Sequence, residues 1–237
     1  MTRLAILGDI HGNADALSAV LDAAKREGVT RILNTGDLLG YYHAPRAVLA
    51  QLSGWQHDAV RGNHEDMLAK TVGDPSETAK VIRDYGHGLS YALETVKAEV
   101  LDALLRLPVS RLLTVDGMRI RLAHGAPWDT DAYVYPDASE EILNRLCDDV
   151  ERPDLIVLGH THYQALWSAS VAGIRIVNPG SVGQPRDRQP GAAWALLDTT
   201  TGYIDLRREP YDMMDVIETA RRIDPHLPYL WTVLTRQ

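Results

Sequence analysis

The chain has 237 residues, of which 24% are charged and 45% hydrophobic, proportions typical of a soluble globular protein. Its formal net charge of -8 disfavours a broad surface for extended nucleic acid. No apolar run approaches the ~20 residues of a membrane span. The single cysteine, Cys147, excludes an internal disulfide. The N-terminus enters strand-like sequence at once, which leaves no room for a signal peptide. We therefore expect a cytoplasmic protein with one domain over residues 1–237 and no membrane partner.

The N-terminal half alternates short apolar runs with stretches of helical period. The predicted strands cover residues 4–7, 31–34 and 57–60. The predicted helices cover residues 13–27, 44–52 and, in two or three pieces broken near Gly86 and Gly88, residues 75–105. Strands that alternate with helices in this way favour βαβ units and a largely parallel sheet.

The C-terminal half favours hairpins. Asp116-Gly117 is a strong two-residue turn signal between predicted strands at 109–115 and 118–123. Ser139 is a plausible N-cap for a helix over 139–149. The remaining predicted elements are strands at 155–158, 165–169, 174–177, 192–197 and 203–207, a helix at 212–223 and an apolar stretch at 227–234 that we expect to pack back onto the domain. Parallel units followed by hairpins predict two packed sheets with helices outside.

Polar residues follow several of these strands in five short blocks. They are Gly8-Asp9-Ile10-His11, Gly36-Asp37, Gly62-Asn63-His64-Glu65, His124-Gly125 and Gly159-His160-Thr161-His162. Taken alone, each block also fits an ordinary turn or a core histidine. Together, oxygen and imidazole ligands gathered at one sheet edge suit a pair of divalent transition metals.

In order and in residue identity, the blocks resemble the signature of the calcineurin-like metallophosphoesterases, from about Leu4 to Arg188. The resemblance implies an α/β (α+β) fold, a four-layer αββα sandwich of two mixed β-sheets flanked by helices. It also implies two divalent transition metal ions, with manganese favoured over iron, zinc, nickel and cobalt. In the family pattern, one ion is held by Asp9, His11 and His162, the other by Asn63, His124 and His160, and both by a bridging Asp37.

The resemblance implies a hydrolase for a small phosphodiester or phosphomonoester, with phosphodiesters favoured and nucleotides among the substrate classes. Two cations that share a carboxylate can acidify a bridging water, and the resulting hydroxide attacks phosphorus in line. His64 is the usual general acid of the family, and a structural role beside the ligands is its alternative.

Three residues are expected to contact the substrate: Arg61, Tyr41 and Arg186. Each has a plainer alternative, which is a structural salt bridge for Arg61, a half-buried loop aromatic for Tyr41 and a solvated charge for Arg186. Arg188 is a further candidate for binding phosphate.

The sequence departs from one branch of the family. Serine/threonine protein phosphatases carry an Asp and an Arg where this chain has Gly40 and Tyr41, which disfavours that branch. In those enzymes the Asp orients the histidine that acts as general acid, so the group that orients His64 is unidentified. The blocks at 36–41 and 178–187 are instead similar to small bacterial and archaeal phosphodiesterases. The alternatives are a dinucleoside polyphosphate hydrolase, a protein phosphatase-like enzyme and a non-catalytic protein-binding scaffold of the same fold. The oligomeric state stays open.

Overall fold

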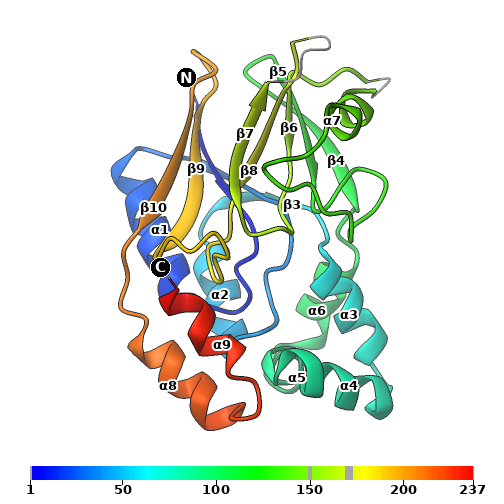
Figure 1. Ribbon diagram of the computed structural model, residues 1–237, viewed down its shortest axis with the longest axis vertical. Coiled ribbons are helices and arrows are strands. Elements are labelled where there is room, and N and C mark those ends of the chain that lie inside the picture. The colour runs from blue at the N-terminus through cyan, green and yellow to red at the C-terminus, as the bar shows by residue number, and fades with distance from the viewer. Residues whose placement is uncertain (1, 149–150, 169–172, 237) are drawn as a thin grey trace.

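The structure is a computed structural model that describes residues 2–148, 151–168 and 173–236 (Figure 1). Two five-stranded sheets pack face to face, with strand orders β10-β9-β1-β2-β3 and β4-β5-β6-β8-β7. Both sheets contain parallel and antiparallel pairs, and helices flank them on the outside. The predicted αββα sandwich of two mixed sheets is therefore confirmed.

All ten predicted strands form, and they differ from the prediction only at their ends. The first sheet consists of β1 (Arg3–Leu7), β2 (Arg31–Asn34), β3 (Gln56–Ala59), β9 (Ala192–Asp198) and β10 (Ile204–Glu209). The second consists of β4 (Ser110–Val115), β5 (Met118–Ala123), β6 (Leu155–Val157), β7 (Gln164–Ser168) and β8 (Arg175–Pro179). Residue 169 of the strand predicted at 165–169 lies outside the described residues.

The predicted helices also form. They are α1 (Ala14–Arg26), α2 (Pro45–Leu52), α4 (Pro75–Tyr85), α5 (Gly88–Thr95), α6 (Ala98–Leu105), α7 (Glu140–Cys147) and α8 (Met214–Ile223). The apolar stretch at 227–234 contains α9 (Tyr229–Thr232) and a 3₁₀ turn, Val233–Thr235. One helix was not predicted, α3 (Asn63–Thr71), because its first residues are polar and show no apolar period. Residue 149 of the predicted helix 139–149 lies outside the described residues.

The alternation of side chains along β1 explains the layers. Leu4 and Ile6 lie in the core between the two sheets, where Val157 of the second sheet joins them. Ala5 and Leu7 point the other way, into the core beneath α1. Successive side chains of a strand face opposite sides of a sheet, so one fully apolar strand serves two cores.

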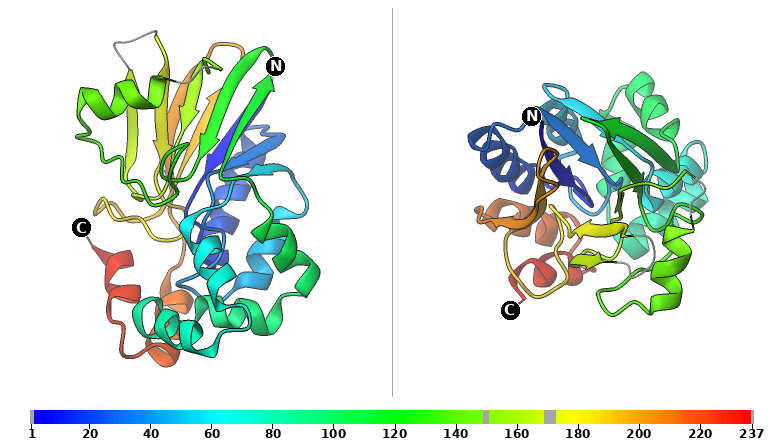
Figure 2. Two further views of the ribbon diagram at one scale, coloured as in Figure 1. Left: turned by 90° about the vertical axis from the view of Figure 1, so that its right-hand side faces the viewer. Right: turned by 90° about the horizontal axis from the view of Figure 1, so that it is seen from above.

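The parallel strands bring several loops to one end of the molecule. In the first sheet β1, β2 and β3 are parallel, and in the second β5, β6 and β8 are parallel. Their carboxyl ends therefore lie at one edge of each sheet. Figures 1 and 2 show α3 to α6, α8 and α9 gathered beyond one end of both sheets. Among the described residues, no helix is long and apolar enough to cross a membrane.

The C-terminal helices pack back onto the loop after β2, as predicted. The hydroxyl of Tyr42 donates to the Leu230 carbonyl at 2.9 Å. Asp224, at the end of α8, is fully buried. Its carboxylate lies 2.7 Å from Nε2 of His43 and accepts from the backbone N–H of His87 at 3.1 Å. One carboxylate thus joins three segments that are distant in sequence.

The Asp224→Asn variant removes the charge from this junction and keeps its shape. Burial raises the pKa of Asp224, but hydrogen bonds from His43 and His87 outweigh burial and lower that pKa to about 2. Hydrogen bonds to charged groups contribute about 1.5–3 kcal/mol, so we expect the free energy of unfolding at pH 7 to fall by about that amount.

The pH dependence of this loss has a defined sign. A carboxyl whose pKa is lowered on folding stabilises the protein above its ordinary pKa of 3.8, and the contribution disappears as the pH falls toward about 2. Urea titrations followed by circular dichroism measure it, with Glu218→Gln on the exposed face of α8 as a control for charge alone. Equal losses in both variants would show that the junction does not stabilise the fold.

Candidate metal centre

Seven polar side chains meet where the carboxyl ends of the two sheets face each other. They follow β1 (Asp9, His11), β2 (Asp37), β3 (Asn63), β5 (His124) and β6 (His160, His162). All are buried except Asn63, which is half-buried. The structure therefore brings together the side chains of all five blocks.

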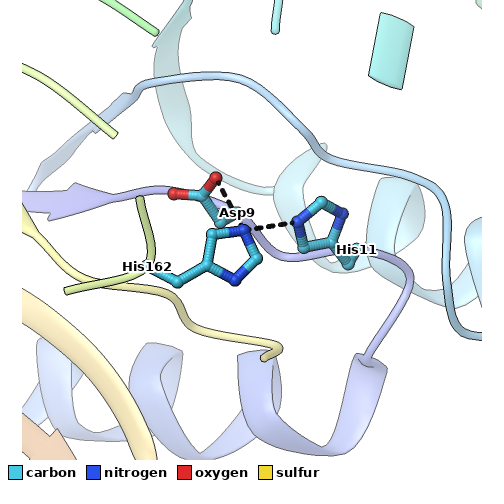
Figure 3. A group of neighbouring side chains, drawn as sticks. All are labelled: Asp9, His11 and His162. Carbon is cyan, nitrogen blue, oxygen red and sulfur yellow. Dashed lines mark hydrogen bonds and ion pairs between the residues drawn. The ribbon is translucent and has the colours of Figure 1, made fainter. Parts of the chain in front are cut away.

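Asp9, His11 and His162 form the first group of potential ligands (Figure 3). Nε2 of His162 lies 3.1 Å from Nε2 of His11 and 3.3 Å from Oδ1 of Asp9. The three ligand atoms lie within 4.8 Å of one another, which suits a single ion.

A second group surrounds Nε2 of His124. This atom lies 3.1 Å from Oδ1 of Asn63, 3.2 Å from Nδ1 of His160 and 3.4 Å from Oδ2 of Asp37. The same Oδ2 atom of Asp37 lies 3.7 Å from Nε2 of His11 in the first group. Asp37 therefore stands between the two groups.

Backbone carbonyls determine which nitrogen of the His124 and His162 rings faces the cluster as a potential ligand. Nδ1 of His124 lies 2.8 Å from the Thr35 oxygen, and Nδ1 of His162 lies 2.6 Å from the Gln184 oxygen. A carbonyl only accepts, so both Nδ1 atoms carry a proton, and each Nε2 atom is the ring nitrogen that can offer a lone pair to a metal ion. Histidine ligands of metals are held in this way, and the donor set therefore fits bound cations.

The buried negative charges of the cluster also favour the binding of a cation. Burial lowers the pKa of His124, but the carboxylates of Asp37 and Asp9 outweigh burial and raise that pKa to about 10. Without a bound metal ion, the buried carboxylates of Asp37 and Asp9 thus keep His124 protonated, because its positive charge compensates theirs. A metal ion that binds here replaces this proton.

The backbone at these residues is strained. The left-handed φ angles of the ligand residues are 53° at Asp9, 53° at His11, 54° at Asp37, 68° at His160 and 63° at His162. Hydrogen bonds between the loops stabilise this conformation, as from the Asp9 N–H to the Gly36 oxygen at 3.1 Å. Strain of this kind concentrates at functional sites, where the surrounding fold compensates for it.

Glu65 has a positioning role that the sequence analysis did not assign. Its carboxylate is buried and accepts from the backbone N–H groups of Asp37, Leu38 and Gly62 at 2.8, 2.9 and 2.9 Å. It thereby joins the loop after β2 to the start of α3 and places Asp37 beside Asn63. Burial and the neighbouring Asp37 carboxylate raise the pKa of Glu65 to about 7. A Glu at the third position of a helix is a capping signal that the sequence contains.

Aromatic packing orients His64. Its Nδ1 is buried and has no hydrogen-bond partner among the described residues. The ring centre lies 4.5 Å from that of His11, 4.6 Å from that of Tyr41 and 5.6 Å from that of Tyr85. Burial lowers the pKa of His64 to about 4. The position where protein phosphatases carry an orienting Asp is Gly40, and here it leaves room for the ring.

The three expected substrate contacts lie in different surroundings. Arg186 is half-buried, and its guanidinium donates to the Tyr41 hydroxyl and to Oε1 of Gln184, each at 3.1 Å. Tyr41 is 8% exposed, with its ring against His11 and His64.

Arg61 adopts its plainer alternative. Its Nε lies 2.7 Å from a carboxylate oxygen of Asp66, and its Nη1 donates to the Leu105 carbonyl at 3.1 Å. This ion pair and hydrogen bond tie α3 to α6. The structure thus brings Arg186 and Tyr41 to the cluster but uses Arg61 in helix packing.

Comparisons with known proteins agree with this geometry. Residues 2–202 match the calcineurin-like phosphoesterase superfamily domain, and the chain belongs to that superfamily. A metallophosphoesterase from Sphaerobacter thermophilus is similar in structure, with a TM-score of 0.77 and 25% identity over 98% of this chain and 99% of that one.

Two archaeal proteins are also similar. The hypothetical protein PH1004 from Pyrococcus horikoshii OT3 shares the fold, with a TM-score of 0.84 and 23% identity over 100% of this chain and 98% of that one. The uncharacterized protein MJ0912 of Methanocaldococcus jannaschii is 28% identical and aligns over 92% of this chain and 91% of its own.

Two glycine variants test how tightly His64 is held. Gly40 and Gly73 both have positive φ angles, of 105° and 75°. A methyl group at Gly40 would lie 2.1 Å from Nδ1 of His64, whereas nothing lies within 4 Å at Gly73. Left-handed strain costs about 1–2 kcal/mol at either site, and overpacking adds about 1–3 kcal/mol at Gly40 alone. We expect Gly40→Ala to lower the free energy of unfolding by more than Gly73→Ala, as measured in urea titrations. Equal losses would mean that the His64 ring moves freely.

Proposed function

We propose that this protein is a dinuclear metal-dependent hydrolase of a small phosphodiester or phosphomonoester, with phosphodiesters preferred. The observation that carries the proposal is the position of Asp37, whose Oδ2 stands between two groups of potential ligands. A carboxylate in that position suits two ions that share one ligand. Membership of the calcineurin-like phosphoesterase superfamily supports phosphoester hydrolysis as the reaction class.

The proposed ligands divide into two sets that share Asp37. One set is Asp9, His11, His162 and Asp37, and the other is Asn63, His124, His160 and Asp37. Mixed oxygen and imidazole donors suit manganese, which we favour, and also iron, zinc, nickel and cobalt. Bound ions of this kind acidify water and neutralise the charge of a phosphoester.

His64 is the proposed general acid for the leaving alkoxide. Its buried ring contacts that of His11, which places it beside the first set of ligands. Burial lowers its pKa to about 4 in the metal-free protein, so its protonation depends on the charges that bind beside it. An anionic phosphoester next to the ring favours the imidazolium form and raises the pKa of His64 toward about 7.

Arg186 is the proposed phosphate-binding residue. Its Nε is buried without a hydrogen-bond partner in the part of the chain that the structure describes, and a phosphate oxygen would supply the acceptor that this N–H lacks. Its Nη2 already contacts Tyr41, which orients the guanidinium. A complete ligand set supports an enzyme rather than a non-catalytic scaffold. The cytoplasmic location and the single domain over 1–237 stay predictions.

Removal of the shared carboxylate should abolish activity and weaken metal binding together. We expect the protein reconstituted with manganese to bind about two ions per chain. Asp37→Asn should bind fewer and hydrolyse bis(p-nitrophenyl) phosphate about 10²–10³-fold more slowly, since it loses a preorganised charge. Elemental analysis after gel filtration gives the metal content, and Asp84→Asn on exposed α4 is the control. Absence of metal after reconstitution would refute the dinuclear site.

The leaving group distinguishes an acid from a structural histidine at position 64. p-Nitrophenolate leaves without a proton, whereas an alkoxide needs one. His64→Ala should therefore slow an alkyl phosphodiester by about 10²–10⁴-fold and the aryl diester much less, since general acid catalysis contributes about that factor. Steady-state kcat values for both esters measure the difference, with exposed His226→Ala as the control. If both esters slow equally, His64 does not protonate the leaving group.

A further inference from the structure

The loop after β5 exposes tyrosine rings beside the metal centre. Tyr133 is 52% exposed and Tyr135 is 43% exposed. Their ring centres lie 5.7 Å apart and the planes differ by only 18°, so the rings are offset and nearly parallel. Tyr163, after β6, meets Tyr135 edge-on at 5.7 Å. We call Tyr133, Tyr135 and Tyr163 the tyrosine strip.

The tyrosine strip begins at a proposed metal ligand. The ring centre of Tyr133 lies 4.2 Å from that of His160. Burial raises the pKa of Tyr133, and the positive charge of Arg186 opposes that shift. The strip therefore extends outward from the place where a phosphoester would lie.

The fold holds these rings in the open. Exposure alternates along this segment: Tyr133 and Tyr135 are exposed, whereas Val134 between them is 4% exposed in the core beneath α7. Val134 thus anchors the segment in the core, while the tyrosines on either side of it stay exposed. The indole N–H of Trp167 donates to the Pro136 carbonyl at 3.1 Å and fixes the following residue. A rigid pair of exposed rings suits ligand binding better than a chance surface contact.

The chemistry of the strip favours a single planar ring. Aromatic side chains stack on nucleobases, with contributions of about 1–3 kcal/mol per base. Asp129, Asp131 and Asp137 of the same loop are exposed, and their charges repel the further phosphates of an extended strand. Tyr41 and Tyr42 cannot provide such a surface, because they are 8% and 0% exposed.

We propose that the tyrosine strip binds the nucleobase of a nucleotide substrate whose phosphorus lies at the metal centre. The position of the phosphate rests on the proposed function. The base itself would stack on Tyr133 and Tyr135, and its sugar would span from these rings to His160. Nucleotides with one or two bases fit this arrangement.

Binding tests the proposal without turnover. The probes are the non-hydrolysable 5′-phosphonate analogues of AMP and of ribose 5-phosphate, titrated by calorimetry into the manganese-loaded protein. The wild type should bind the adenosine compound at least about 5-fold more tightly, since a stacked base contributes at least ~1 kcal/mol. Tyr133→Leu should lose this preference, and Tyr133→Phe, which keeps the ring, should retain it.

The matched control is Tyr203→Leu. Tyr203 is 66% exposed and precedes β10. It lies beside Asp198, which pairs with Arg3 at the start of β1, whereas Asp9 of the metal centre follows the end of β1. This control should keep the full preference. Equal binding of the two probes by the wild type, or a preference that survives in Tyr133→Leu, would overturn the proposal.

Kinetics separates this proposal from the proposed function. The p-nitrophenyl esters of thymidine 5′-phosphate and of methyl phosphate release the same leaving group. Tyr133→Leu should lower the ratio of their kcat/KM values at least about 5-fold, by the loss of stacking. If no ester is hydrolysed but the binding preference depends on Tyr133, the hydrolase proposal fails and the strip stands. If both esters are hydrolysed with an equal ratio in wild type and variant, the strip is wrong and the hydrolase stands.

Discussion

The packing of two anionic carboxylates and four imidazoles at the junction of two sheets is the constraint on which this structure depends. Asp9 and Asp37 are 0% and 1% exposed, so their charges need compensation within the protein. Compensation requires the two sheet edges to come very close. A methyl group at Gly159 would lie 2.3 Å from the Thr35 hydroxyl and 3.0 Å from Oδ2 of Asp9, so only glycine fits there. Because a cation satisfies this cluster better than a proton on His124, metal binding and the stability of this edge are coupled.

The same cost of burying negative charge explains the surroundings of His64. A carboxylate beside this ring would add a further buried acidic group next to Asp37 and Glu65. Gly40 and Tyr41 instead leave a neutral, aromatic enclosure around the imidazole. A ring held by packing alone has its pKa lowered by burial, and its protonation then depends on the charge of what binds beside it. The departure from the protein phosphatase pattern therefore changes how the proposed acid becomes charged, while its location stays the same.

The sequence predicted what is encoded locally and missed what depends on distant contacts. Apolar runs such as 155–158 fixed the strands, and glycine-flanked ligands at strand ends indicated the cluster, because parallel strands share an edge. α3 was missed, since its start depends on Glu65 and on the loop after β2 rather than on an apolar face. The burial of Tyr41 depends on helices from the far end of the chain, which no local pattern contains. The sequence analysis assigned no role to Tyr133 and Tyr135, because nothing in the local sequence places Tyr133 beside His160.

Our two proposals divide substrate recognition between two kinds of interaction, one at the tyrosine strip and one at the metal centre. In the proposed mechanism, the ions and Arg186 would act on the phosphate charge that every phosphoester presents, so they would select the class of reaction but hardly discriminate among substrates. Selection among phosphoesters must come from the group attached to phosphorus, and a rigid exposed ring next to His160 is placed to contact that group. Buried tyrosines such as Tyr42 contribute to stability instead, because their faces are already covered. Specificity in this fold can therefore change with the loop after β5 while the ligand loops stay fixed by their strain and hydrogen bonds.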